Sequence, residues 1–438
     1  MGRPNVVLMV SHDTGRFYGP YGHATVDQPS FEALAASSVT FGRAFCTTPL
    51  CSPARSALTT GRYPHQNGLN GLMGGSLGEW RMSETDRHLA CVLKAAGYMT
   101  VLCGDIHESM DLFSVGFDEG IHGSGWLNNW NDGRIRGAGA DIGAWLDRNP
   151  EAGRGRPFYM QIGCGETHRD WEGSYSERGV WKAPYLIDSP DVDAEMAMLQ
   201  SSCNALDRGL GEVMDAFGSR GLAEDTVFVV TTDHGIDFPR AKGTLFDPGV
   251  GVGLFMRHDA GGWRRGVRED ALVSHVDVYP TVLEACGVPC PDGLEGRSLL
   301  GFLKAGAPAG PKRDAVYLEK TYHDNYDPMR GLRTERHKYV LNFDAQTLYD
   351  VRSATAPRYG WFRQPFTKMN REELYDLEAD PNEERNLASD PAYAPLALEL
   401  KTRLARWMRA TGDPLLRGPM PSPYHHRVCN EMNALSRD

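Results

Sequence analysis

The sequence predicts an α/β protein: a mostly parallel β-sheet flanked by helices, followed by a smaller C-terminal α+β domain with a short antiparallel sheet and a helix. Three observations support this fold class. Four short, continuous apolar runs rich in β-branched residues occur in the first part of the chain, and helical stretches separate them. Such runs are typical of strands that are buried on both faces of a parallel sheet. After about residue 310 the pattern changes to short alternating segments, which indicates the smaller domain.

Each of the four apolar runs leads into a short polar segment. The runs cover residues 5–10, 101–104, 158–162 and 227–230. The polar residues that follow them are His12 and Asp13, His107, His168, and Asp233 with His234. Ligands of open α/β sheets bind beyond the carboxyl ends of the strands. We therefore expect these side chains to converge on one crevice.

The length of the chain and one linker-like segment predict two domains. With 438 residues, the chain exceeds the size at which a single core usually stops growing. Residues 304–311 are rich in small residues and proline, as linkers often are. We expect a larger domain over residues 1–310 and a smaller one over residues 311–438. Within the smaller domain, the pattern predicts strands at 315–319, 329–334, 339–342 and 373–377 and an amphipathic helix over 394–411.

The composition excludes several classes of function. A formal net charge of −11, without any block of Lys or Arg, argues against nucleic acid as a partner. No window approaches the ~20 apolar residues that a membrane span needs. The first predicted strand begins at residue 5, which leaves no room for a secretory leader, and the nine cysteines fit a reducing compartment. We therefore expect a cytoplasmic protein with no membrane segment; the oligomeric state is not predicted.

The most informative motif begins at Cys51. This cysteine stands two residues before Pro53 and four before Arg55, and T-G-R follows at residues 60–62. The stretch resembles the signature of type I sulfatases, which belong to the alkaline-phosphatase-like superfamily. In that family a maturation enzyme oxidises the cysteine to formylglycine, and the hydrate of this aldehyde is the nucleophile. An intact motif of this kind also argues against a non-catalytic binding protein with the same fold.

Further segments strengthen the resemblance. D-H-G at residues 233–235, followed by K-G-T-L at 242–245, is similar to a second sulfatase block, and residues 373–387 resemble a stretch near sulfatase C-termini. Thr167-His168-Arg169 and residues 323–330 are most similar to the branch that contains heparan N-sulfatase (sulfamidase). The resemblance implies an alkaline-phosphatase-like fold and hydrolysis of a sulfate ester or sulfamate, on a sulfated sugar or a small organic sulfate.

The resemblance also implies one divalent cation and a formylglycine-generating maturation enzyme as a partner. By position, the metal ligands would be His12, Asp13, residue 51, Asp233 and His234. Oxygen ligands suit Ca²⁺ or Mg²⁺. His12 stands where the family usually has Asp, however, and two imidazoles would shift the preference toward Mn²⁺ or Zn²⁺. The cofactor is therefore expected to be Ca²⁺ or Mn²⁺.

Four more residues receive roles from the resemblance. His107 would serve the elimination that restores the aldehyde, and His168 would lie near the leaving group. Lys242 would bind the sulfate and the departing atom, and Arg55 would anchor the nucleophile. Histidine suits the two proton transfers because it titrates near neutral pH.

One further position departs from the family. Many sulfatases have Lys two residues before the equivalent of His107, where this chain has Asp105. Loss of this cation weakens sulfate binding or requires a replacement, for which His12 or Arg169 could serve. The alternative is a phosphonate or phosphate ester hydrolase of the same superfamily, because the resemblance also extends to members that use the same nucleophile on phosphorus.

The polar segment at residues 323–330 is a candidate for substrate recognition. We expect it to form a loop that reaches over the pocket of the first domain, before a strand that begins near Met329, because polar loops on a rigid scaffold often determine specificity. Its candidate substrate-binding residues are His323, Asp324, Tyr326 and Arg330. By resemblance to the sulfamidase branch, an N-sulfated or O-sulfated glucosamine is the leading substrate.

Overall fold

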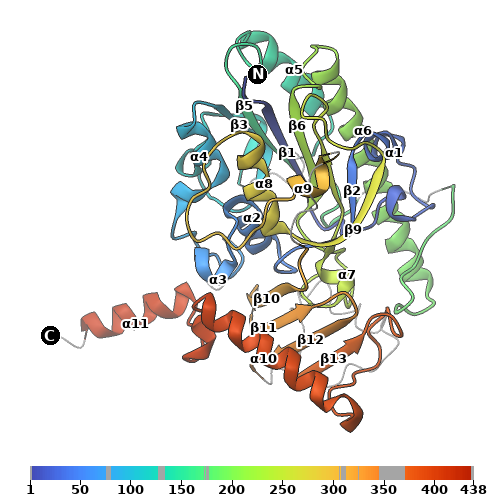
Figure 1. The fold of residues 1–438 in the computed structure, drawn as a ribbon, viewed down its shortest axis with the longest axis vertical. Helices are drawn as coiled ribbons and strands as arrows, with labels where there is room; N and C mark the ends of the chain where they lie inside the picture. The colour runs from blue at the N-terminus through green and yellow to red at the C-terminus, as the bar shows by residue number, and fades with distance from the viewer. Residues whose placement is uncertain are drawn as a thin grey trace.

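The structure, a computed structural model, describes residues 2–74, 80–126, 134–171, 173, 177–304, 306, 312–323, 325–344 and 370–435. Its strands form two sheets, one of nine strands and one of four (Figure 1). Within the described residues, no helix is both long enough and apolar enough to cross a membrane.

The larger sheet is mostly parallel, as predicted. Its strands are β1 (Asn5–Ser11), β2 (Val39–Phe45), β3 (Met99–Ile106), β4 (Glu119–Trp126), β5 (Phe158–Cys164), β6 (Thr226–Thr232), β7 (Gly251–Val252), β8 (Leu254–Arg257) and β9 (Val267–Ser274). They follow the order β4-β3-β5-β1-β6-β8-β2-β7, with β9 paired to β2. The pairs from β4 to β6 are all parallel, whereas β8 runs antiparallel to both β6 and β2. The four predicted apolar runs are β3, β5, β1 and β6, which are direct neighbours.

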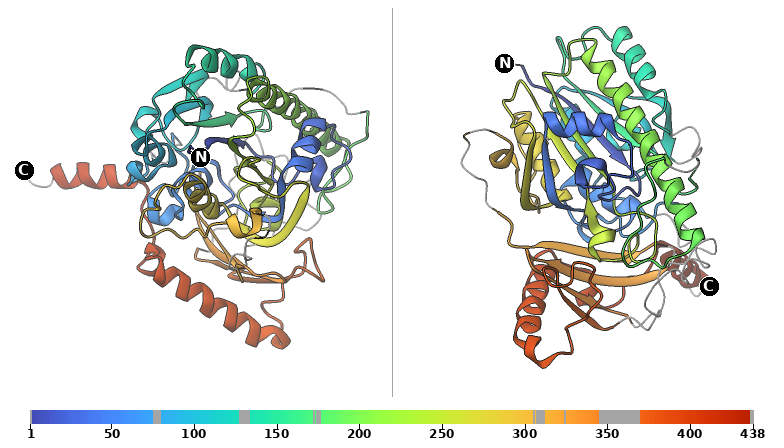
Figure 2. Two further views of the ribbon diagram at one scale, coloured as in Figure 1. Left: turned by 45° about the horizontal axis from the view of Figure 1, so that its top comes forward. Right: turned by 90° about the vertical axis from the view of Figure 1, so that its right-hand side faces the viewer.

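Helices cover both faces of this sheet. They are α1 (Pro29–Ser37), α2 (Cys51–Thr60), α3 (Pro64–Asn67), α4 (Leu89–Ala95), α5 (Ala138–Arg148), α6 (Pro190–Gly218), α7 (Asp247–Val250), α8 (Val278–Ala285) and α9 (Leu300–Leu303). The central strand β1 shows why two covered faces are needed. Val6 and Leu8 join a core with α2, α4 and α8, whereas Val7 and Met9 join a second core with α1, α5 and α6 (Figure 2). Successive strand residues point to opposite faces, so an uninterrupted apolar run requires cover on both sides.

The second sheet is antiparallel and forms the expected smaller α+β part. Its strands, in spatial order, are β10 (Val316–Tyr322), β11 (Tyr326–Arg333), β12 (His337–Asn342) and β13 (Glu372–Asp376). Helix α10 (Ala394–Ala410) packs on one face, where Leu404 and Trp407 meet Leu332 and Tyr339. The other face joins the core of the larger sheet. Helix α11 (Pro423–Leu435) has no buried residue and extends away from the rest of the structure (Figure 1).

The division into domains at residues 310 and 311 remains a prediction. Both residues lie outside the described part of the chain. The second sheet begins shortly afterwards, at Val316.

The prediction of a polar loop over residues 323–330 is wrong for most of this segment. Strand β11 already begins at Tyr326, three residues before the predicted start, and only residues 323–325 connect it to β10. The prediction rested on the polar residues of this segment, but β11 contains several of them together with Pro328, which lacks the N–H that a central strand needs. In the structure, the pairing of β10 with β11 is irregular between Lys320 and Tyr322, next to this proline. A bulge is one of the places where a strand accepts proline.

Candidate active site

Polar side chains that follow three strands and a side chain from one helix meet at the carboxyl ends of these strands in the larger sheet. His12 and Asp13 directly follow β1, His107 directly follows β3, and Asp233 and His234 directly follow β6. Cys51 lies at the same place but comes from a helix, since it is the first residue of α2. The N-terminus of a helix offers free N–H groups and favours negative charge.

Four of the expected metal ligands are close enough to share one ion. Ligand atoms of His12, Asp13, Cys51 and Asp233 all lie within 4.8 Å of one another, and all four residues are buried. Oδ1 of Asp13 accepts no hydrogen bond from a described residue. A buried carboxylate oxygen without a donor is costly unless a cation is present, so this donor set fits a divalent ion.

His234 is oriented as a fifth candidate ligand. Its Nδ1 donates to the backbone carbonyl of Gly235 at 3.0 Å, which leaves Nε2 with the lone pair. That Nε2 lies 3.3 Å from Oδ1 of Asp13 and 3.2 Å from Sγ of Cys51. A backbone contact of this kind fixes the tautomer that can ligate a metal.

The two carboxylates differ in their electrostatic environment. Burial would raise the pKa of Asp233, but His234, Arg55 and His12 hold it well below its usual range. Burial raises the pKa of Asp13 to about 6, although Lys242 and His234 oppose the shift. Asp233 is therefore the firmly ionised member of the pair.

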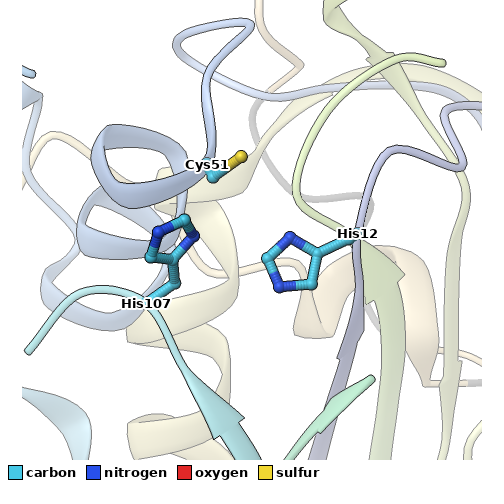
Figure 3. A group of neighbouring side chains, drawn as sticks. All are labelled: His12, Cys51 and His107. Atoms are coloured by element: carbon cyan, nitrogen blue, oxygen red, sulfur yellow. The ribbon is translucent and has the colours of Figure 1, made fainter. Parts of the chain in front are cut away.

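Cys51 lies in an electropositive and water-excluded environment. Its side chain is 1% exposed, and the imidazoles of His12 and His107 face its sulfur (Figure 3). Burial would raise the pKa of the thiol, but Lys242 and the surrounding histidines lower it well below its usual range. The same positive environment suits an oxyanion at this position.

Arg55 lies one helical turn after Cys51 and holds the neighbouring groups in place. Its Nε donates to Oδ2 of Asp233 at 3.2 Å, and its Nη2 donates to the carbonyl of Ser11 at 3.2 Å. The guanidinium is thereby fixed against one metal-ligand candidate and the end of β1.

Lys242 and His168 both approach Asp13. Nζ of Lys242 lies 2.7 Å from Oδ2 of Asp13, and Nε2 of His168 lies 3.9 Å from the same oxygen. Nδ1 of His168 donates to the carbonyl of Arg169, so in the neutral ring Nε2 carries the lone pair. Burial, Lys242 and His12 lower the pKa of His168 well below its usual value. For His107, burial likewise lowers the pKa, with His12 and Arg55 adding to the shift.

Arg169 does not replace the lysine that many sulfatases have at the position of Asp105, because its guanidinium already has other partners. The Arg169 guanidinium forms ion pairs with Asp237 and Glu195, and it lies 3.9 Å above the ring of Trp171. Asp105 itself is buried, and burial raises its pKa although His12 and Arg55 oppose the shift.

The substrate-binding candidates of the second sheet have different surroundings. His323 is buried, and Tyr326 is half-buried with its hydroxyl accepting from the backbone N–H of Met420 at 3.2 Å. Asp324 lies outside the described residues. Arg330 corrects the expectation: it is 0% exposed, and its Nε lies 2.5 Å from Oδ2 of Asp413. Its remaining nitrogens contact Asp413, Lys320, Thr321 and Met329, so the guanidinium has no free edge for a substrate.

Strand β10 connects the second sheet to the site. The N–H of Glu319 donates to the carbonyl of Thr47, and the N–H of Tyr322 donates to the carbonyl of Asn70. Between them, Nζ of Lys320 donates to the carbonyl of Gly243 at 3.0 Å, next to Lys242. Strand β10 is thus anchored to segments close in sequence to Cys51 and Lys242.

The sequence analysis missed two residues that hold the site together. Glu108 accepts from the N–H of His107 at 3.1 Å and from the amide of Gln161 at 2.6 Å. Burial would raise its pKa, but His88 and Arg55 lower it to about 2. Its position directly after a candidate catalytic histidine was a usable signal. The second residue, Lys320, forms a buried ion pair with Asp327 at 2.6 Å, which no local pattern indicates.

Comparisons with known proteins show which family the chain belongs to. Residues 4–288 match the family model described as Sulfatase, and residues 240–358 match the model described as N-sulphoglucosamine sulphohydrolase, C-terminal. The human N-sulphoglucosamine sulphohydrolase is 28% identical over 474 residues, which covers 95% of this chain and 92% of the human protein. An ulvan-active sulfatase from Formosa agariphila is 26% identical over 462 residues, covering 94% of this chain and 76% of that protein.

Solved structures show the same fold. BT4656 in complex with its substrate D-glucosamine-2-N,6-O-disulfate superimposes with a TM-score of 0.73 at 17% identity, covering 95% of this chain and 99% of that chain. BT1596, a 2-O GAG sulfatase, superimposes with a TM-score of 0.70 at 19% identity and covers 95% and 94%. Because the sulfatase model spans most of the larger sheet and the segments that carry the site, this chain belongs to the sulfatase family and is a hydrolase of sulfuric esters or sulfamates.

Proposed function

We propose that this sulfatase removes the sulfate of an N- or O-sulfated glucosamine through a formylglycine formed from Cys51. The observation that carries the proposal is the place of Cys51: it is buried at the start of α2, among three histidines and Lys242. Two relatives support the sugar: one is named N-sulphoglucosamine sulphohydrolase, and another was solved with a sulfated glucosamine as its substrate. Hydrolysis of a phosphonate or phosphate ester has no support from the relatives above.

The proposed cofactor is one divalent cation, held by His12, Asp13, residue 51, Asp233 and His234. The cation would offset the charge of the sulfate and activate the nucleophile, which formylglycine supplies as its hydrate. Mn²⁺ is our preferred ion because the donor set contains two imidazoles, and Ca²⁺ is the alternative.

The other residues of the site stabilise negative charge or transfer protons. Lys242 offers its ammonium group to the sulfate, and Arg55 keeps Asp233 ionised and in place. His107, whose lowered pKa keeps it neutral, accepts a proton from the hydroxyl group of residue 51. Because a neutral His168 presents a lone pair at Nε2, it protonates the leaving group only after it has itself taken up a proton.

Residues 311–438 would supply the sugar-binding part of the pocket. His323 and Tyr326 are the candidates, since they lie next to the end of β10, where Tyr322 contacts Asn70. We also propose a cytoplasmic location, supported by nine cysteines that are all free.

The test combines the mass of one peptide with activity. Co-production with a formylglycine-generating enzyme should yield a Cys51 peptide about 18 Da lighter than the thiol form, whereas ordinary oxidation of a thiol adds mass. That protein should hydrolyse sulfated glucosamine faster than nitrophenyl sulfate, and hardly hydrolyse nitrophenyl phosphate. Cys51→Ala should be inactive but folded, and Cys290→Ala, at an exposed cysteine, should be unaffected. Substantial activity in Cys51→Ala would contradict the proposal.

A further inference from the structure

The side chains closest to the Cys51 sulfur include two imidazoles that come from different strands. His12 follows β1 and His107 follows β3, and both rings face the start of α2 (Figure 3). Ligand atoms of His12, Cys51 and His107 lie within 4.8 Å of one another. All three side chains are at most 2% exposed. They form a compact nitrogen and sulfur donor set that is shielded from solvent.

His107 has no competing partner in this arrangement. Apart from the Cys51 sulfur, no described residue offers a hydrogen bond to either of its ring nitrogens. A buried imidazole without partners is costly. Its ring centroid lies 5.5 Å from that of His12, with the two planes tilted by 54°. Both rings can therefore approach one point without stacking on each other.

The geometry is close to that of a small tetrahedral site. Around a Zn²⁺ ion with bonds of about 2.0–2.3 Å, the ligand atoms are roughly 3.3–3.8 Å apart. The three donor atoms, which lie within 4.8 Å of one another, would have to move inward by about 1 Å at most. Asp13 and Asp233 form an overlapping group with His12 and Cys51, so a carboxylate is available as the fourth ligand.

The charge balance also permits a cation. Lys242 lies against Asp13, and Arg55 lies against Asp233, so each carboxylate has one positive partner. A thiolate at residue 51 adds a negative charge to this group. A divalent ion therefore meets three negative and two positive side chains, and the buried group ends close to neutral.

We propose that the folded chain with unmodified Cys51 binds one Zn²⁺ ion through His12, Cys51 and His107. Binding replaces the thiol proton, which is released to solvent, and involves no change of oxidation state. Sulfur and imidazole ligands prefer Zn²⁺ over Ca²⁺, which takes oxygen ligands. Conversion of Cys51 removes the sulfur donor, so the unmodified and modified forms differ in the metal that they prefer.

This site overlaps the cation site of the proposed function at His12 and residue 51, but the two ligand sets differ. That site has an oxygen at residue 51 and includes His234, whereas the zinc site needs the sulfur and recruits His107. The inference therefore does not depend on sulfatase activity, and its test measures only metal binding.

The test uses the full chain produced without a maturation enzyme, with the thiol at residue 51 verified by mass. After treatment with a chelator, Zn²⁺, Mn²⁺ and Ca²⁺ are titrated by calorimetry, and Co²⁺ is added as a coloured substitute for zinc. We expect one Zn²⁺ per chain, bound at least 100-fold more tightly than Ca²⁺. Co²⁺ should give the near-ultraviolet absorption of a thiolate–cobalt bond, and Zn²⁺ should protect Cys51 from iodoacetamide.

Variants identify the ligands. Cys51→Ser should lose the thiolate–cobalt absorption, and His107→Asn should weaken Zn²⁺ binding by about 100-fold or more, since loss of even an outer-shell partner costs 10–100-fold. His23→Asn, at a partly buried histidine outside the cluster, is the matched control and should bind as the wild type does. Absence of the thiolate band in the wild type would overturn the proposal, and that result depends on no variant. Unchanged Zn²⁺ affinity in a folded His107→Asn variant would also overturn it.

Discussion

Nζ of Lys242 lies 2.7 Å from Oδ2 of Asp13, at a point where both side chains are almost completely shielded from solvent. The lysine is the principal group that opposes the rise in the pKa of Asp13 on burial. It therefore supports one candidate metal ligand and, in the proposed function, also binds the sulfate. This double role makes it the most informative single substitution in the site.

Replacing Lys242 with Met should reduce kcat by about 10²–10³-fold, the usual cost of removing one preorganised charge-stabilising group. The control is Lys94→Met, which breaks a surface ion pair with Asp118 and should leave kcat unchanged. Steady-state kinetics on sulfated glucosamine would measure both. A loss of less than tenfold in Lys242→Met would count against a role for Lys242 in the reaction.

The buried pair of Arg330 and Asp413 leads to a prediction about stability. Arg330→Met leaves the Asp413 carboxylate buried without its cation, which should lower the free energy of unfolding by about 3–5 kcal/mol. The double variant with Asp413→Leu should recover much of that loss because no unpaired charge remains. Urea unfolding of the three proteins would measure this. If Arg330→Met raised KM and left the unfolding curve unchanged, Arg330 would be a substrate contact after all.

Glu166 should make stability depend on pH. It is 3% exposed, and burial raises its pKa from 4.5 to about 7, although hydrogen bonds such as the one from the N–H of Ile135 at 2.5 Å oppose the shift. The folded state therefore keeps this proton in a range where the unfolded chain has lost it. Its contribution to stability is complete below about pH 4.5 and is lost as the pH rises to about 7, by at most about 3 kcal/mol.

Glu166→Gln isolates this effect. The variant should be more stable relative to the wild type at pH 8 than at pH 5, as measured by urea unfolding at both values. The comparison cancels the other groups that titrate in the same range. A stability difference that does not change with pH would show that Glu166 has an ordinary pKa in the folded state.

His323 should affect the choice of substrate. If its side chain binds the sugar, His323→Ala should raise KM for sulfated glucosamine by about tenfold, which corresponds to one lost hydrogen bond. KM for nitrophenyl sulfate, which lacks the sugar, should change little. His337→Ala, in strand β12 of the same sheet, is the control. An equal effect on both substrates would assign His323 a structural role instead.

The sequence predicted those parts of the fold that leave a local pattern. The continuous apolar runs of β1, β3, β5 and β6 identified the centre of the larger sheet because a strand covered on both faces needs no polar residue. The patterns did not indicate β2, β4, β7, β8 or β9. Strand β7 has two residues and β8 has four, which is too short for a periodic signal. Strand β9 carries charged residues in its first half, so it resembles a loop.

The residues of the candidate site also divide into those that a local sequence pattern indicates and those that only the folded chain brings together. His12, His107 and Asp233 could be found because each follows a recognisable strand, and the crevice lies where those strands end. Arg330 could not be interpreted, since its partner Asp413 is 83 residues away and no local pattern connects them. Glu108 and Lys320 act through contacts with backbone groups and distant side chains, which only the folded chain shows.

The burial of Cys51 has a consequence for the order of events during synthesis. Strand β1 lies between β5 and β6, so the site that encloses Cys51 cannot close until residue 234 has been made. At about 5–20 residues per second, this leaves roughly 10–40 s in which residue 51 is outside the ribosome but not yet enclosed. In the finished fold its side chain is 1% exposed, so no protein-sized catalyst can reach it. An enzyme that converts Cys51 would therefore have to act on the growing chain. Whether a molecule carries cysteine or formylglycine at residue 51 would then be decided before about its last 200 residues have been made.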